Sequence, residues 1–376
     1  MRSTTKLMKN WQFTGPDGKT VAVDLPHTWN NIDGQDGGND YWRGTCTYKT
    51  QFAAPAFDVA AQQVWLQFEG VNASARVTLN GVEVASHNGG YSTFRADITT
   101  VLGENNELTV EVDNSKNDRV YPQKADFTFY GGIYRDVTLL VVNKNHLALD
   151  YLGGPGVQIT PTVNGSNADI HVKSWTEGDG EVEFTVYGAD GSEVVSGKGS
   201  DTTVTIEHPH LWDGVRDPYL YTCVVRLVLN GEVQDEVGQR FGVRSFSVDS
   251  KQGFFLNGRP YPLHGVSRHQ DRKGLGNAIT REMHDEDMQF IKELGANTIR
   301  LAHYQHDQYF YDLCDEAGMV VWAEIPYISE HMPNGRENTI SQMKELIVQN
   351  YNHACIVCWG VSNLSLIHIS EPTRPY

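Results

Sequence analysis

Short apolar runs, each bounded by turn residues, fill the first 142 positions of the chain and predict β-strands. Examples are the runs 64–68, 75–79 and 108–112. Asn80-Gly81 follows the second of these runs, and Asn-Gly favours a tight β-hairpin turn because both central residues need positive φ. Residues 1–142 are therefore predicted to form an antiparallel β-sandwich of jelly-roll size.

The same rhythm continues over residues 143–248. Apolar and polar positions alternate along 181–187 and again along 222–229, which ends in a second Asn-Gly pair at 230–231. A block of this size with about seven short strands is typical of an immunoglobulin-like β-sandwich. A second all-β domain is predicted here.

After residue 249 the pattern changes from all-β to alternating strands and helices. Residues 280–295 have a helical periodicity, with Thr280 as N-cap and Met288, Ile291 and Leu294 on the apolar side. The elements that follow are a strand at 297–301, a helix at 307–318, a strand at 319–322, a helix at 339–353 and a strand from 356. This alternation indicates parallel strands joined by helices. Residues 249–363 are predicted to form the first half of a (β/α)8 TIM barrel, which makes the chain a multidomain β plus α/β protein.

The charge of the chain and its lack of long apolar stretches limit the kinds of partner it can bind. The 376-residue chain has a formal net charge of −17, which disfavours binding to nucleic acid or to anionic membrane surfaces. No apolar stretch is long enough to span a membrane, and the first ten residues lack the apolar run of a secretory signal. We expect a cytoplasmic protein whose five cysteines are reduced, and Cys355 and Cys358, which flank a strand, are interpreted as small buried residues.

Polar side chains gather where the predicted parallel strands end. They lie at 267–270, at Arg300, at 303–304, at 324–327 and at 362–363. In a βα barrel these strand ends converge on one rim, which is where functional groups are found. The sequence therefore predicts a polar site at this rim.

Several separate motifs, all in the expected order, carry a family resemblance. They resemble glycoside hydrolase family two, and in particular its bacterial β-galactosidases, at 25–29, 131–137, 264–269, 297–304 and 314–322. The resemblance implies a sugar-binding first domain and retaining hydrolysis of terminal β-D-galactosides, with a small-molecule β-galactoside as substrate. Such chemistry needs a carboxylate nucleophile and a carboxylic general acid/base about 5 Å apart, one ionised and the other protonated.

The resemblance also implies roles for five residues in binding the substrate. His269 and His303 would contact sugar hydroxyls, Arg300 would hold the carboxylates, and Asn363 would contact the 2-hydroxyl. Asp126 would reach from the first domain to the galactose 6-hydroxyl and, as in well-known members, to a sodium ion. A weaker expectation is that Asn39 or Asp40 also reaches the sugar.

The largest departure from the family pattern follows Asn363. The family has its acid/base glutamate at the next position, where this chain has Leu364, so neither catalytic carboxyl is expected in this chain. We interpret residues 364–376 as a non-native tail translated from a sequencing adapter, and this chain is expected to be inactive. Tyr327 and Ser329 stand where magnesium-binding members carry Glu and His, which makes a magnesium site doubtful.

Alternatives remain open at this stage. Within the same family the substrate could be a β-glucuronide or a β-mannoside instead of a β-galactoside. Outside it, the first domains could form a non-catalytic carbohydrate-binding protein. The sequence does not fix the oligomeric state, and a homo-oligomer is left open for the full-length enzyme.

Overall fold

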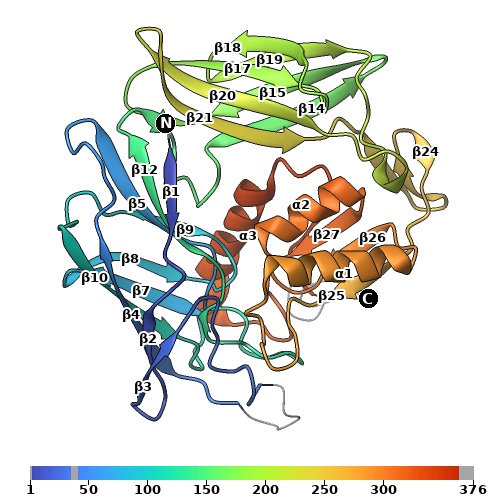
Figure 1. Ribbon diagram of the computed structural model, residues 1–376. Coiled ribbons are helices and arrows are strands. Elements are labelled where there is room, and N and C mark those ends of the chain that lie inside the picture. Colours follow the sequence, from blue (N-terminus) through green and yellow to red (C-terminus); the bar gives the residue numbers. More distant parts are fainter. Residues whose placement is uncertain (1, 35–40, 364–376) are drawn as a thin grey trace.

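The computed structural model describes residues 2–34 and 41–363, which form three successive domains (Figure 1). The first domain is a sandwich of two antiparallel sheets. The smaller sheet contains β1 (Ser3–Lys6), β12 (Val137–Asn143), β5 (Gln62–Phe68) and β9 (Phe94–Asp97). The larger contains β3 (Thr20–Val23), β2 (Trp11–Thr14), β4 (Thr45–Ala53), β10 (Asn105–Asp113), β7 (Ser74–Leu79) and β8 (Val82–Asn88). The two sheets enclose one core that includes Trp11, Tyr48 and Leu66.

The hairpin predicted at Asn80-Gly81 is confirmed. These two residues join β7 to β8 and have φ angles of 51° and 82°, as a type I′ turn requires. A short pair, β6 (Val71–Asn72) and β11 (Gly132–Ile133), lies apart from the two main sheets.

The second domain is the predicted seven-stranded sandwich. One sheet contains β14 (Val157–Asn164), β15 (Asn167–Ser174) and β19 (Asp201–Glu207). The other contains β18 (Glu193–Lys198), β17 (Glu181–Tyr187), β20 (Tyr221–Leu229) and β21 (Glu232–Phe241). Where the chain passes from the first sandwich to the second, β13 (His146–Leu147) pairs with β16 (Thr176–Glu177).

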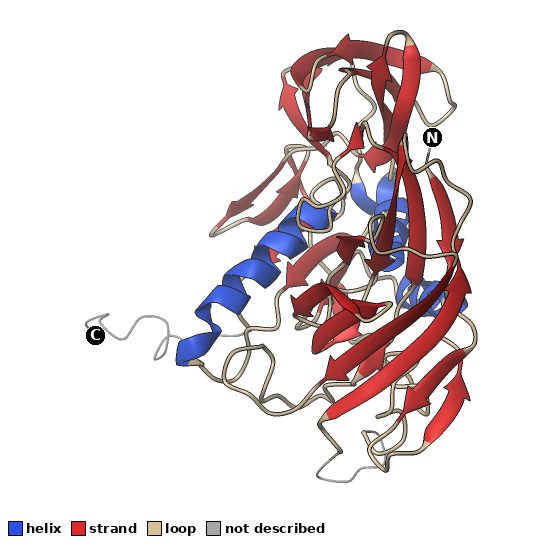
Figure 2. Ribbon diagram, turned by 90° about the vertical axis from the view of Figure 1, so that its left-hand side faces the viewer, coloured by secondary structure: helices blue, strands red, loops and turns tan. Residues whose placement is uncertain are grey.

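The third domain holds the three α-helices of the described residues, as the blue segments of Figure 2 show. It begins with a small antiparallel sheet of β22 (Phe246–Asp249), β23 (Gly253–Leu256) and β24 (Arg259–Pro260). A parallel sheet follows, made of β25 (Gly265–Arg268), β26 (Thr298–Leu301), β27 (Val320–Glu324) and β28 (Ile356–Gly360). It is connected by α1 (Arg281–Glu293), α2 (Gln308–Ala317) and α3 (Arg336–Asn350). This arrangement confirms the predicted half of a TIM barrel.

Two details of the helices differ from the prediction. Helix α3 begins at Arg336 and not at residue 339, because the 3-10 turn Pro333–Gly335 leads directly into it. In α1, Met288 and Ile291 are buried as predicted, but Leu294 is 72% exposed. Leu294 is the C-cap residue, where the chain already leaves the helical path, so helical periodicity no longer fixes its direction.

Helix α3 holds the three domains together through polar side chains. Glu345, which is buried, accepts hydrogen bonds from Ser92 Oγ and from a ring nitrogen of His87 in the first sandwich. The Gln349 amide exchanges two hydrogen bonds with the backbone of Thr93, at 3.0 and 2.9 Å. Just past the helix, Asn352 accepts a 2.8 Å hydrogen bond from a backbone N–H of β14. In Figure 1 this helix lies between the first sandwich and the rest of the barrel domain.

A pair of helix-ending glycines gives a matched test of domain packing. Gly318 ends α2 and Gly295 follows α1, with nearly equal φ angles of +70° and +72°. A Cβ on Gly318 would lie 2.2 Å from the Gly214 backbone of the second domain, whereas a Cβ on Gly295 meets nothing within 4 Å. Gly295→Ala should cost about 1–2 kcal/mol for the left-handed conformation alone. Gly318→Ala should cost about 1–3 kcal/mol more, because the domains must also separate. Urea unfolding measures the loss of unfolding free energy in each variant. Equal losses in Gly295→Ala and Gly318→Ala would contradict a close contact between the domains at Gly318.

Candidate active site

The C-terminal ends of β25 to β28 bring together four of the five predicted site residues. His269 follows β25, Arg300 lies in β26 with His303 just beyond it, and Asn363 follows β28. Because the strands are parallel, these ends share one edge of the sheet. The fifth residue, Asp126, approaches from the first sandwich, in the segment between β10 and β11.

A buried carboxylate organises this edge. Glu324, at the end of β27, is only 1% exposed and accepts two hydrogen bonds from the guanidinium of Arg300, at 2.5 and 3.0 Å. Arg300 also donates a 2.5 Å hydrogen bond to Oδ1 of Asn363. The sequence placed Glu324 at this rim but gave it no role. Glu324 thus holds the Arg300 side chain in place, and Arg300 in turn binds Asn363.

His303 is held in an unusual backbone conformation beside the same carboxylate. Its φ is 71°, and its backbone N–H donates a 2.9 Å hydrogen bond to Oε2 of Glu324. Its ring nitrogen Nδ1 lies 3.7 Å from the same oxygen and has no hydrogen-bond partner among residues 2–34 and 41–363. A left-handed residue this bulky needs such support, and conformations of this kind concentrate at functional sites.

The aromatic ring of Phe127 packs against both histidines. It stacks on His303 with ring centroids 5.2 Å apart and an interplanar angle of 9°, and lies 5.1 Å from the ring of His269. The two histidine rings are themselves 5.1 Å apart. Phe127 thus gives the site an aromatic wall from the first sandwich, and the charge of its neighbour Asp126 acts on both histidine rings. The sequence analysis missed Phe127, because nothing in a lone Phe within a loop signals this contact.

Both histidines are neutral near pH 7. Burial is the main cause that lowers the pKa of His303 to about 4, and the positive charge of Arg300 acts in the same direction. Burial also lowers the pKa of His269, while the exposed carboxylate of Asp126 acts against the shift at both rings. Neutral imidazoles both donate and accept hydrogen bonds, which suits them to the hydroxyl groups of a sugar.

Some predicted features of the site have a definite location and others do not. Asn39, Asp40 and Leu364 lie outside the described residues, as does the predicted tail at 364–376.

Tyr327, at the position of the doubtful magnesium site, makes two contacts. Its hydroxyl is 3.1 Å from a ring nitrogen of His331, and the backbone carbonyl of Tyr327 accepts a hydrogen bond from the backbone N–H of Asn363. Within the described chain, Asp126 belongs to no group of three His, Cys, Asp or Glu ligands, so the sodium site stays a prediction.

The one three-ligand group found in the described chain contains Cys355. Its other members are Asp315 and His353. Asp315 accepts a 2.7 Å hydrogen bond from His353 Nδ1 and a 2.8 Å hydrogen bond from the backbone N–H of Cys355. Both carboxylate oxygens are therefore already in use, and the group anchors the start of β28 to α2. Cys355 is buried as predicted, whereas Cys358 is partly exposed.

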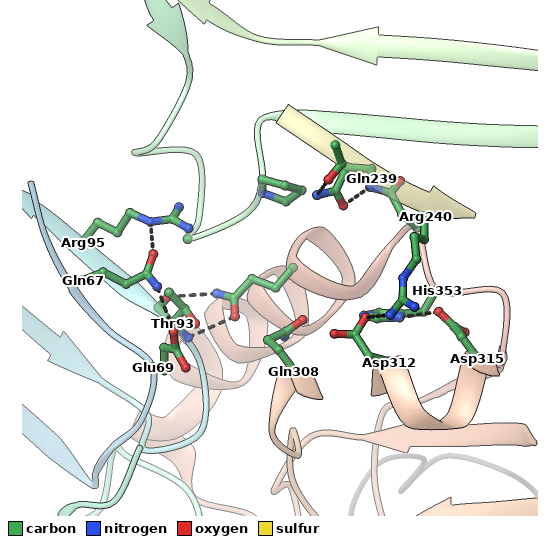
Figure 3. Close-up of a pocket in the computed structure, with 15 residues that line it drawn as sticks. Gln67, Glu69, Thr93, Arg95, Gln239, Arg240, Gln308, Asp312, Asp315 and His353 are labelled. Carbon is green, nitrogen blue, oxygen red and sulfur yellow. Dashed lines mark hydrogen bonds and ion pairs between the residues drawn. The ribbon is translucent and has the colours of Figure 1, made fainter. Parts of the chain in front are cut away.

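A separate polar cavity of about 380 Å³ lies where the three domains meet (Figure 3). Glu69 and Arg95 of the first sandwich line one side of it, and Arg240 of the second sandwich lines another. Gln308 and Asp312 of α2, with Gln349 of α3, line its third side, and none of the residues named at the polar rim lines it. This cavity belongs to the domain junction and not to the candidate active site.

Glu69 in this cavity should make stability depend on pH. Burial, followed by the charges of Asp307 and Asp136, raises its pKa from 4.5 to about 7. A raised carboxyl pKa means that ionisation costs stability above the unfolded pKa, with the full cost reached above about pH 7. Glu69→Gln should therefore raise the free energy of unfolding by about 1–3 kcal/mol at pH 8 and change it little at pH 4. Thermal unfolding at the two pH values checks this, and an equal change at both would contradict it.

Two β-sandwiches followed by parallel βα units, with polar groups gathered at the strand ends, define a modular TIM-barrel protein with two accessory β-domains. Three sequence models of one family match consecutive parts of the chain. They are the galactose-binding domain-like model of glycosyl hydrolase 2 at 35–146, glycosyl hydrolases family 2 at 155–244, and the family's TIM barrel domain at 247–371. The chain belongs to glycosyl hydrolase family 2. The last match reaches beyond residue 363, and the domain boundary there stays a prediction.

Relatives with two different names resemble the chain. A β-glucuronidase of Bacteroides fragilis is 38% identical over 96% of this chain and 56% of its own length. A β-galactosidase of Thermoanaerobacter pseudethanolicus is 29% identical over 93% of this chain and 49% of its own length. The crystal structure of an FMN-binding β-glucuronidase from Facaelibacterium prausnitzii L2-6 has a TM-score of 0.95 at 44% identity, covering 98% of this chain and 59% of that one. The chain thus spans about half the length of the curated relatives it matches.

Proposed function

We propose that the full-length protein is a retaining glycoside hydrolase that removes a terminal β-linked sugar, and that this chain supplies one wall of its sugar subsite. The observation that carries the proposal is the set of neutral His269 and His303 beside the Arg300–Glu324 pair at the strand ends. The two imidazoles would bind sugar hydroxyls, and Arg300 would hold Asn363 against the 2-hydroxyl. The acid/base would follow Asn363 directly, at the position of Leu364.

The substrate that we propose is a β-glucuronide. Relatives named β-glucuronidase are 38% and 44% identical to the chain, whereas the β-galactosidase described above is 29% identical and a putative β-galactosidase of Bacteroides fragilis is 40% identical. The β-galactoside predicted from the motifs is the second candidate. Hydroxyl groups common to both sugars satisfy the histidines equally well, so these side chains do not distinguish the two substrates.

Hydrolysis of 4-nitrophenyl glycosides by the full-length gene product tests the proposal. Fastest release from the β-glucuronide is expected, and faster release from the β-galactoside would select the second candidate. If neither glycoside is hydrolysed but calorimetry shows that the free sugars bind, the protein is a non-catalytic carbohydrate-binding protein and the proposed enzymatic function is wrong. The 376-residue chain itself is expected to release no nitrophenol, because its Leu364 cannot transfer a proton.

Other expectations about the whole protein stay predictions. They are the cytoplasmic location, the sodium ion at Asp126, the doubtful magnesium site and the open oligomeric state. In the described part of the chain, no helix is long and apolar enough to cross a membrane.

A further inference from the structure

Tyr304, which directly follows His303 in the chain, is a buried side chain of the candidate active site. It is only 6% exposed. Its ring stacks on Tyr91 of the first sandwich, with ring centroids 4.5 Å apart and an interplanar angle of 12°. It also stacks on the ring of His306, with centroids 5.0 Å apart. These stacked rings hold the Tyr304 hydroxyl in one position.

The Tyr304 hydroxyl contacts two groups that belong to the segment after β25. The backbone N–H of Gln270 donates a 3.0 Å hydrogen bond to it, and Nδ1 of His269 lies 3.3 Å away. A backbone N–H can only donate, so it does not use the proton of the hydroxyl. Burial raises the pKa of Tyr304 well above its ordinary value of 10, so the hydroxyl keeps this proton at physiological pH. Within residues 2–34 and 41–363, Nδ1 of His269 is the one acceptor that the proton reaches.

This contact decides which ring nitrogen of His269 carries a proton. The ring is neutral near pH 7, because burial lowers its pKa. A neutral imidazole has one N–H, so if Nδ1 accepts a hydrogen bond from Tyr304, the proton of the ring is on Nε2. With the opposite tautomer, both partners of the hydroxyl would be donors. The hydroxyl proton of a buried tyrosine would then have no acceptor in the described chain, which is costly.

We propose that Tyr304 is a positioning residue that holds His269 with its proton on Nε2, so that His269 donates a hydrogen bond to an oxygen of the sugar. This inference deepens the proposed function and rests on it. The first sandwich then acts on the site in two ways, through Phe127 against the ring of His269 and through Tyr91 against Tyr304. A donor that is already oriented before the sugar arrives lowers the entropic cost of binding.

The competing explanation is that Tyr304 only fills space. Its ring contacts alone would then matter, and its hydroxyl would have no effect on His269. Tyr304→Phe separates the two cases, because phenylalanine keeps the stacked ring and removes only the hydroxyl. Tyr309→Phe is the matched control, since it removes an exposed hydroxyl that donates a 2.7 Å hydrogen bond to Asp285.

Nitrogen-15 NMR of the histidines in the 376-residue chain reads the tautomer directly at pH 7. We expect a protonated Nε2 and a bare Nδ1 for His269, both in the unaltered chain and in Tyr309→Phe. In Tyr304→Phe the Nδ1 resonance of His269 should shift, because this nitrogen loses its hydrogen-bond donor. A protonated Nδ1 in the unaltered chain, or an unchanged His269 spectrum in Tyr304→Phe, would overturn the proposal.

Hydrolysis of 4-nitrophenyl glycosides by the full-length gene product tests the consequence for the site. Tyr304→Phe should lower kcat/KM by about 10-fold or more, because misplacing a positioned group can cost up to about 100-fold. Tyr309→Phe should keep the kcat/KM of the unaltered protein. If Tyr304 acts through His269, Tyr304→Phe should cause little further loss in a His269→Gln background.

Equal losses from Tyr304→Phe in the two backgrounds would show a purely structural role and would contradict the proposal. The proposed function fails separately, if the unaltered full-length protein hydrolyses no glycoside. In that case the NMR spectra still decide whether Tyr304 fixes the tautomer of His269.

Discussion

Replacing Arg300 with alanine should lower the free energy of unfolding by about 3–5 kcal/mol, the usual loss when one partner of a buried ion pair is removed. Glu324 is 1% exposed and accepts both hydrogen bonds of the Arg300 fork. Without the guanidinium, its charge keeps only one hydrogen-bond donor from the described part of the chain, the backbone N–H of His303. Chemical denaturation of the 376-residue chain measures the loss.

Two further variants separate the buried charge from the general effect of losing an arginine. Arg226→Ala removes the partner of Glu236 at 2.7 Å on a partly exposed strand, and should cost less than about 1 kcal/mol. The double variant Arg300→Leu with Glu324→Leu removes both charges, and should be more stable than Arg300→Ala alone. If Arg226→Ala and Arg300→Ala cost the same, the proposed organising role of Glu324 is wrong.

The second large effect is expected at Asp315. This carboxylate is 1% exposed and pairs with His353 Nδ1 at 2.7 Å. Burial alone would lower the pKa of His353, but the charge and hydrogen bond of Asp315 outweigh it and raise that pKa above 6.5. A raised histidine pKa stabilises the fold fully below pH 6.5, and this stability is lost as pH rises through the folded pKa. Asp315→Asn should cost about 3–5 kcal/mol at pH 6 and less at pH 9.

Unfolding curves at several pH values check both the size and the slope of this effect. Asparagine keeps an oxygen for the Cys355 N–H, so the change isolates the charge. His210→Gln, at an exposed pair 2.6 Å from Asp217, should cost less than about 1 kcal/mol at pH 6. A loss in Asp315→Asn that does not change between pH 6 and pH 9 would argue against the charged His353.

The fold was largely predictable because each domain has its own periodicity. Alternation and Asn-Gly turns marked both sandwiches, and the strand–helix order marked the half barrel. Of the site, the residues at the strand ends could be predicted, since parallel strands bring their ends to one edge. Phe127 and the role of Glu324 could not, because each depends on contacts between distant segments. Phe127 meets His303 across a domain boundary, and Glu324 acts only through its pairing with Arg300.

The helix at α3 was predicted from the sequence, but its contacts with the first sandwich were not, for a related reason. Amphipathic periodicity identifies a helix that buries apolar side chains, whereas α3 buries mainly polar ones, such as Glu345 and Gln349. Their partners in the first sandwich lie more than 250 residues away in the sequence. Tertiary hydrogen bonds of this kind leave no local pattern.

The polar contacts of α3 also bear on how sandwiches could be exchanged between relatives. An apolar interface tolerates small shifts, but a buried carboxylate or amide must meet its partner within hydrogen-bonding distance or lose stability. A chimaera with a foreign first sandwich therefore needs a hydroxyl opposite Glu345, as Ser92 provides, and a free backbone edge opposite Gln349, as Thr93 provides. Sequence similarity between the sandwich cores will therefore predict poorly which chimaeras assemble. The residues opposite Glu345 and Gln349 will predict it better.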